Sequence, residues 1–150
     1  MSETASLNRE LICFRVGQQE YGVDIHDVRE IRGWTPATPL PRTENYVRGV
    51  INLRGAVLPI VDMATRLGLG QSEVTERHVI IVVAIQGQQV GLLVDAVCDI
   101  LPAPEAALQA TPELVSDAHG LVEALLSVDE RMIALMRLDA LLPEAEERAA

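Results

Sequence analysis

The stretch RGVINLRGAVLPIVDM, residues 48–63, consists of two apolar runs separated by Asn-Leu-Arg-Gly at residues 52–55. Before this break, the β-branched pair Val50-Ile51 favours an extended backbone, and after it residues 57–61 are bulky and apolar. Gly55 can adopt positive φ without steric cost, which lets the backbone reverse. The pattern therefore predicts a β-hairpin that turns at Arg and Gly.

The end of the same stretch predicts where the hairpin stops. Pro59 has no N–H to donate, so the returning strand is expected at a sheet edge or a bulge at that point. Asp62, followed by residues 63–67 and then Gly68, has the pattern of a helix N-cap, one or two helical turns and a glycine stop. Arg54 would place a planar, permanently charged group with five donors at the hairpin tip, where it can face a partner.

Residues 11–16 alternate in the manner of a strand that buries one face. The buried face would consist of Ile12, Phe14 and Val16. Residues 17–20 then turn the chain, and the next strand is expected to end in a helical or irregular turn near Asp27. Three prolines in residues 35–41 predict an extended connector after it.

The second half of the chain repeats this order of features. Gly87-Gln88-Gln89 matches residues 17–19, and residues 91–100 align with residues 22–31. A proline-rich connector follows again, with Pro102, Pro104 and Pro112.

The closing segments of the two halves also align. Residues 120–122 parallel residues 49–51, and residues 136–139 parallel residues 59–62, so that Asp139 would take the place of Asp62. A doubled unit of about five short strands predicts an all-β fold, in which two small five-stranded barrels pack together and short helical turns connect the strands.

Composition limits the possible functions. With 150 residues and 16.3 kDa, the chain is long enough for its own core, and 49% hydrophobic against 3% aromatic residues makes that core aliphatic. The formal charge of −10 repels phosphate backbones and anionic lipid, so neither nucleic acid nor a membrane surface is an expected partner. From Val79 onward there are three arginines against twelve acidic residues, which either steer a basic partner or only keep the surface solvated.

No pattern in the sequence indicates catalysis, a cofactor or a metal site. Cys13 and Cys98 lie in apolar stretches without a C-x-x-C pair and are expected to be buried free thiols. His26, His78 and His119 are scattered, and glycine-rich phosphate loops are absent. Two classes remain open: a non-enzymatic adaptor, and a small-molecule-binding or catalytic double barrel with its site in the groove between the lobes.

The sequence also predicts a cytoplasmic protein. Residues 1–10 lack the basic and apolar regions of a signal peptide. The longest apolar run, residues 79–85, is far shorter than the ~20 residues that span a bilayer, so direct membrane insertion is not expected.

GVINLRGAVLPIVDM resembles the signature of the CheW family, the coupling proteins of bacterial chemotaxis, and the resemblance extends over about residues 10–142. It implies a single CheW-like domain over residues 1–150, with two intertwined SH3-like barrels whose lobes cover approximately residues 10–77 and 78–142. Residues 143–150 would form a charged tail, either as a C-terminal helix or as a frayed end.

The resemblance further implies a non-enzymatic adaptor that couples chemoreceptor tips in membrane-bound receptor arrays to the regulatory domain of the histidine kinase CheA. Val28, Glu30, Gly49 and Arg54 match positions that the family uses for receptor contact, whereas no short motif indicates the kinase-binding residues. Alternatives stay open for each of the four. Val28 could belong to the core, Gly49 could serve backbone geometry alone, and Glu30 and Arg54 could pair with each other.

Overall fold

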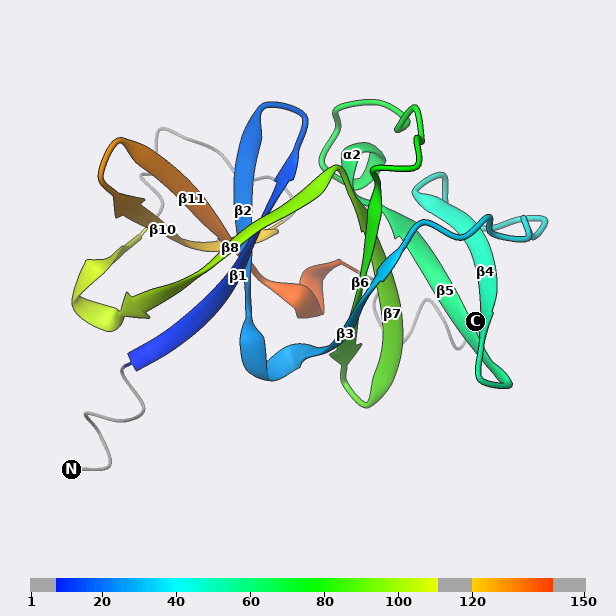
Figure 1. Cartoon of the computed structure of the whole chain (residues 1–150), viewed down its shortest axis with the longest axis horizontal. Coiled ribbons are helices and arrows are strands. Elements are labelled where there is room, and N and C mark those ends of the chain that lie inside the picture. The colour runs from blue at the N-terminus through cyan, green and yellow to red at the C-terminus, as the bar shows by residue number, and fades with distance from the viewer. Residues whose placement is uncertain (1–7, 111–119, 142–150) are drawn as a thin grey trace.

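Two twisted β-sheets make up the computed structural model, which describes residues 8–110 and 120–141 (Figure 1). The predicted tail or helix at residues 143–150, Pro112 and His119 lie outside the described residues. The strands are β1 (Asn8–Val16), β2 (Gln19–Asp24), β3 (Val28–Gly33), β4 (Val47–Leu53), β5 (Ala56–Asp62), β6 (Val79–Ile85), β7 (Gln88–Val94), β8 (Ala96–Pro104), β9 (Leu108–Gln109), β10 (Val122–Val128) and β11 (Arg131–Met136). Short helical turns connect some of them: η1 (Ile25–Asp27), α2 (Met63–Arg66), η2 (Glu105–Ala107) and η3 (Leu138–Ala140).

Each sheet combines strands from both halves of the chain. The sheet that we call barrel 1 has the order β3-β6-β7-β5-β4, and the sheet that we call barrel 2 has the order β8-β1-β2-β11-β10-β9. The β1–β2 hairpin therefore lies among strands of the second half, and the β6–β7 hairpin lies among strands of the first half. The predicted all-β fold of two small barrels is confirmed, with the two-residue strand β9 as a sixth strand in barrel 2.

The strand order is the same in the two barrels, and the irregularities also correspond. A bulge lies between Val47 and Gly49 in the β4–β5 pair, and another lies between Val122 and Ala124 in the β10–β11 pair. Ala124 therefore takes the place of Gly49, and the predicted equivalence with Gly120 is wrong. The sequence alignment matched Gly49 with Gly120 because both are glycines. The equivalent positions are instead set by how β4 pairs with β5 and how β10 pairs with β11.

The predicted hairpin is confirmed as β4 and β5. Arg54 and Gly55 both adopt positive φ, at 52° and 89°, and the Gly55 N–H donates to Asn52 Oδ1 at 2.7 Å. Pro59 lies on a strand that is internal to the sheet, so the expectation of an edge strand is wrong for β5 as a whole. At Pro59 itself, however, β5 pairs with β4 alone, because its pairing with β7 begins only at Ile60. The missing N–H of Pro59 is therefore tolerated there.

Strand β1 buries both faces, contrary to the prediction of one. Ile12 and Phe14 face an apolar core between the barrels, whereas Leu11 and Cys13 face the interior of barrel 2. Burial raises the pKa of the Cys13 thiol to about 12. Cys98 is exposed, so its predicted burial is wrong.

Three apolar clusters fill the molecule. The largest, which we call the shared core, joins β1 and β2 of barrel 2 to β6 and β7 of barrel 1. The other two fill the interiors of barrel 1 and barrel 2. Like β1, strand β6 separates two of these clusters, because Ile81 and Val83 face the shared core and Ile80 and Val82 face the barrel 1 interior.

Asp62 caps α2 as predicted and is almost fully buried, with 1% of its surface exposed. Its carboxylate accepts hydrogen bonds from Ala64 N at 3.1 Å, Ser72 N at 2.9 Å and Ser72 Oγ at 2.6 Å, and it lies 3.7 Å from Arg48 Nε. In barrel 2 this place is taken by Arg137 and not by the predicted Asp139. The Asp62 and Arg137 N–H groups donate to matching carbonyls, Tyr46 and Leu121.

We predict that Asp62→Ala lowers the free energy of unfolding by about 2–4 kcal/mol, because it removes a cap, leaves partly buried donors without their acceptor and removes the carboxylate that pairs with Arg48. Asp139→Ala is the matched control and should change stability by less than about 0.5 kcal/mol, since Asp139 is exposed. Urea denaturation measures both, and equal losses would contradict the corrected alignment of the repeats.

Candidate functional site

Three charged side chains meet where β3 lies opposite the tip of the β4–β5 hairpin. Arg54 Nη2 donates to Glu30 Oε1 at 2.5 Å, and Arg32 Nη1 donates to Glu30 Oε2 at 3.1 Å. We call Arg32, Glu30 and Arg54 the rim triad. Strand β3 is one edge of barrel 1 and the β4–β5 hairpin forms the other, so the triad joins the two edges of the sheet.

The members of the rim triad differ in exposure. The Arg54 side chain is 69% exposed, whereas Glu30 and Arg32 are 28% and 30% exposed. The hydrogen bond from Arg54, followed by the one from Arg32, lowers the pKa of the Glu30 carboxyl, and the bond to Glu30 raises the pKa of Arg54. Glu30 and Arg54 are therefore charged near neutral pH. Because a guanidinium is permanently charged, the rim triad carries a net charge of +1 on a chain of −10.

Of the four residues predicted from the sequence, the structure brings Glu30 and Arg54 into direct contact. Val28 starts β3, pairs with Val83 and packs partly buried against the shared core. Gly49 is buried beneath the connector, and a Cβ added there would lie 2.2 Å from the Thr38 carbonyl oxygen. Its φ of 139° is also unfavourable for other residues.

Sequence reasoning missed Arg32. The signal was its spacing, because residues i and i+2 of a strand lie on the same face and Arg32 is two residues after Glu30. The partnership of Glu30 with Arg54, 24 residues away, was only one of two alternatives. The contact between Glu30 and Arg54 depends on the path of the segment between β3 and β4, which brings the hairpin tip back to the edge strand β3.

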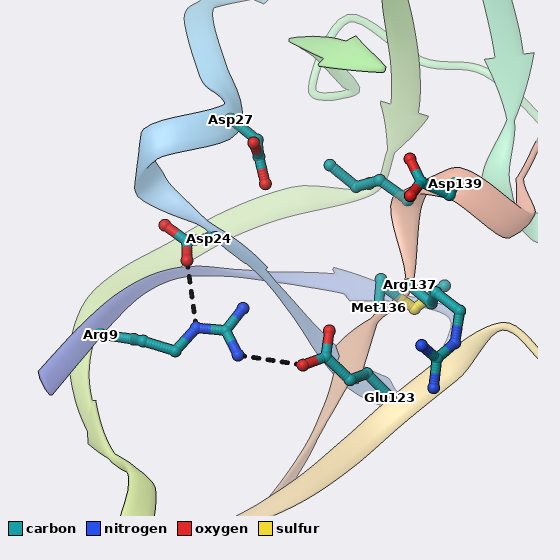
Figure 2. Close-up of a pocket in the computed structure, with 8 residues that line it drawn as sticks. Arg9, Asp24, Asp27, Glu123, Met136, Arg137 and Asp139 are labelled. Atoms are coloured by element: carbon teal, nitrogen blue, oxygen red, sulfur yellow. Dashed lines mark hydrogen bonds and ion pairs between the residues drawn. The ribbon is translucent and has the colours of Figure 1, made fainter. Parts of the chain in front are cut away.

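A second group of charged residues lines a hollow of about 250 Å³ beside β1, η1 and the end of β11 (Figure 2). Arg9 lies across it and pairs with Asp24 at 3.1 Å and with Glu123 at 3.0 Å. Asp24 also accepts from the His26 N–H at 2.9 Å. Against the effect of burial, the bonds from His26 and Arg9 hold the pKa of Asp24 below its ordinary value, whereas burial and the charge of Asp24 raise the pKa of Asp27.

The charged groups around Arg9 in this hollow are already engaged with one another. Both carboxylate oxygens of Asp24 are occupied, and the nearby His26 is 84% exposed on η1. Within residues 8–110 and 120–141, no group of three or more His, Cys, Asp or Glu side chains is placed to hold a metal ion. No helix in the same part of the chain is long and apolar enough to cross a membrane.

These features define a double-barrel, all-β module with an arginine at the rim of one barrel whose side chain is 69% exposed. A family model described as a CheW-like domain matches residues 10–146. The chain therefore belongs to the CheW family of chemotaxis coupling proteins.

Similar proteins cover nearly the whole chain. A chemotaxis protein CheW from Rhizobium meliloti is 55% identical over 143 residues, which are 95% of this chain and 92% of the relative. A probable chemotaxis protein CheW from Rhizobium etli is 54% identical over 144 residues, covering 95% and 93%. The crystal structure of the scaffolding protein TtCheW from Thermoanaerobacter tengcongensis superposes with a TM-score of 0.84 at 32% identity, covering 91% of this chain and 89% of that one. The predicted SH3-like architecture is thus confirmed.

We predict that Gly49→Ala lowers the free energy of unfolding by about 2 kcal/mol or more, because the new Cβ would collide with the main chain at Thr38. Gly33→Ala is the matched control, since nothing lies within 4 Å of a Cβ at that place in β3. Thermal unfolding of the two variants compares them. A Gly49→Ala variant as stable as Gly33→Ala would show that the backbone does not require this glycine.

Proposed function

We propose that this chemotaxis adaptor joins the cytoplasmic tip of a chemoreceptor to the regulatory domain of the histidine kinase CheA. It would act as one domain over residues 1–150, without catalysis or a cofactor, in the cytoplasm beside membrane-bound receptor arrays. The observation that carries the proposal is the family match over residues 10–146, together with an exposed arginine at a family receptor position.

The names of the similar proteins support this role. The relatives from Rhizobium carry the name chemotaxis protein CheW, and the structural neighbour is named a scaffolding protein. We extend the role to this chain because the similarity covers both barrels and not only the signature hairpin. The charge of −10 is also consistent with protein partners and not with nucleic acid or lipid.

The four receptor positions would act in two ways. Arg54 and Glu30 reach the surface and would contact the receptor, with Arg54 as the more exposed of the two. Val28 and Gly49 would support that surface, since Val28 packs against the shared core and Gly49 lets the connector cross β4. The kinase-binding residues are left unassigned.

The absence of catalysis is proposed from the charged groups themselves. In the part of the chain that the structure describes, Arg9 and Asp24 are committed to ion pairs, and Cys13 is a buried thiol whose raised pKa keeps it protonated. A nucleophile needs an adjacent base to be activated. Cys98 is exposed, but burial of part of its surface raises its pKa as well.

The test is to replace Arg54 with Ala and to titrate the variant against the receptor cytoplasmic fragment and, separately, against the kinase regulatory domain. An arginine at the centre of an interface typically carries enough binding energy for a loss of about 30-fold on truncation, so receptor affinity should fall by about that factor. Kinase affinity should stay the same. The melting temperature should change by less than about 2 °C, because ion pairs of exposed groups contribute little to stability.

Arg77→Ala is the control, since Arg77 is also exposed but lies on the loop before β6. Wild-type receptor affinity in the Arg54 variant would refute the contact. A large fall in melting temperature together with the loss of binding would show that Arg54 is a structural residue. Failure of the wild-type chain to bind either fragment would refute the proposed function.

A further inference from the structure

The two barrels carry ion clusters at corresponding places, but the clusters have opposite charge. Glu30 on β3 and Asp99 on β8 occupy equivalent positions in the two barrels. Each is the first paired residue after a β-bulge in its edge strand, Glu30 opposite Val82 and Asp99 opposite Cys13. Asp99 pairs with Arg131, which also pairs with Glu20. Barrel 2 thus has two carboxylates around one guanidinium, for a net charge of −1, whereas the rim triad has two guanidiniums around one carboxylate.

Arg131 is an arginine that makes its hydrogen bonds within the fold. Its guanidinium donates from Nε, Nη1 and Nη2 to both Glu20 and Asp99, at distances of 2.5–3.2 Å, and 32% of its side chain is exposed. Its donors therefore point at acceptors within the molecule. One arginine is enough to connect the acid of the edge strand to the hairpin.

Arg54 differs from Arg131 on each of these points. Among the described residues its one hydrogen-bond acceptor is Glu30, reached through Nη2 alone, and 69% of its side chain is exposed. A guanidinium has five N–H donors, so most of those of Arg54 are directed to solvent. Barrel 2 is closed by a single arginine, so the unused N–H donors of Arg54 and the net positive charge of the rim triad are not needed to close barrel 1.

A carboxylate is the group best suited to the free N–H donors of Arg54 and to the net positive charge of the rim triad. It accepts two parallel N–H bonds from a guanidinium, and the charge-assisted bonds are stronger than those to a neutral carbonyl. A chain of −10 repels acidic partners at a distance, and the net charge of +1 at the rim triad favours such a group at this place.

Arg32 would act through Glu30. It occupies Glu30 Oε2 while Arg54 occupies Oε1, so the carboxylate is held from two sides. The Arg32 side chain is 30% exposed, and its Nε atom is buried. It is therefore less able than Arg54 to reach a partner.

Resting on the proposed function, we propose that Arg54 of the rim triad binds a carboxylate of the chemoreceptor tip, and that Arg32 is a positioning residue that holds Glu30, and through it Arg54, for that contact. We expect no equivalent contact in barrel 2, because Arg131 already donates from all three of its nitrogens to two acids of the chain.

The test is a set of double-mutant cycles with the purified cytoplasmic fragment of a chemoreceptor from the same organism. Each Asp or Glu of its tip is changed singly to Asn or Gln and titrated against the wild-type chain and Arg54→Gln. One acidic position should lose about 10- to 30-fold in affinity in the wild-type chain and almost nothing further in Arg54→Gln, because both changes remove the same charged hydrogen bonds. Arg54→Gln should also weaken the dependence of affinity on salt.

Arg32→Gln should lower affinity by about three- to tenfold in the wild-type background and have no effect in Arg54→Gln, and Arg32→Lys should restore part of the loss. Arg77→Gln is the neutral control, and its cycles should be additive. A merely structural role of Arg32 would instead lower affinity equally in both backgrounds.

The outcomes separate this inference from the proposed function. If the wild-type chain does not bind the fragment, both fail. If it binds and Arg54→Gln weakens binding, but no acidic position of the tip is coupled to Arg54, the proposed function stands and the carboxylate contact is wrong. If Arg32→Gln behaves like Arg77→Gln, the positioning role of Arg32 is wrong.

Discussion

The shared core between the barrels is the contact on which the rest of the structure depends. Strands β1 and β6 each send alternate side chains into this core and the others into a barrel interior, so separating the barrels would expose one face of both strands. Arg66 at the end of α2 adds a polar link, since it donates to the carbonyl oxygens of Ala140 and Leu141 at 2.8 and 2.9 Å. A barrel of about 70 residues would alone bury only about 60% of the surface that its unfolded chain exposes, which leaves such a small unit marginally stable. We infer that the exchanged hairpins make the two barrels one folding unit.

The two barrels differ in the ion pairs formed by the equivalent acidic residues of their edge strands, Glu30 in barrel 1 and Asp99 in barrel 2. In barrel 2 the edge-strand acid and an arginine form a saturated cluster, which closes the sheet and leaves few donors for a partner. In barrel 1 the corresponding acid lies between two arginines, and one of them is mostly exposed. Duplication of a small barrel thus lets one copy hold the structure while the other presents charge. Under the proposed function, this division suits an adaptor, because an exposed ion pair contributes little to folding and Arg54 can therefore be adapted to a partner.

Local patterns were predictable from the sequence, and contacts between distant segments were not. The turn at Arg54-Gly55 and the capped helix after Asp62 depend on neighbouring residues, and both were predicted correctly. The burial of both faces of β1 was missed, because a strand flanked by two cores contains apolar residues in the same alternation as a strand with one core. The match of Arg137 with Asp62 was missed because the repeats preserve backbone register and not residue type. The rim triad combines a contact over 24 residues, which was predicted only as one of two alternatives, with a local spacing of two residues, which is present in the sequence but was missed.

Native-state hydrogen exchange in increasing urea tests the central claim, that the exchanged hairpins make the barrels one cooperative unit. The informative amides are those of the central strands: β5 and β7 in barrel 1, and β2 and β11 in barrel 2. The account predicts that the slowest amides of the two barrels converge on one free energy of opening, equal to that of global unfolding. Exchange of one barrel through an opening of clearly lower free energy, while the other stays protected, would contradict it.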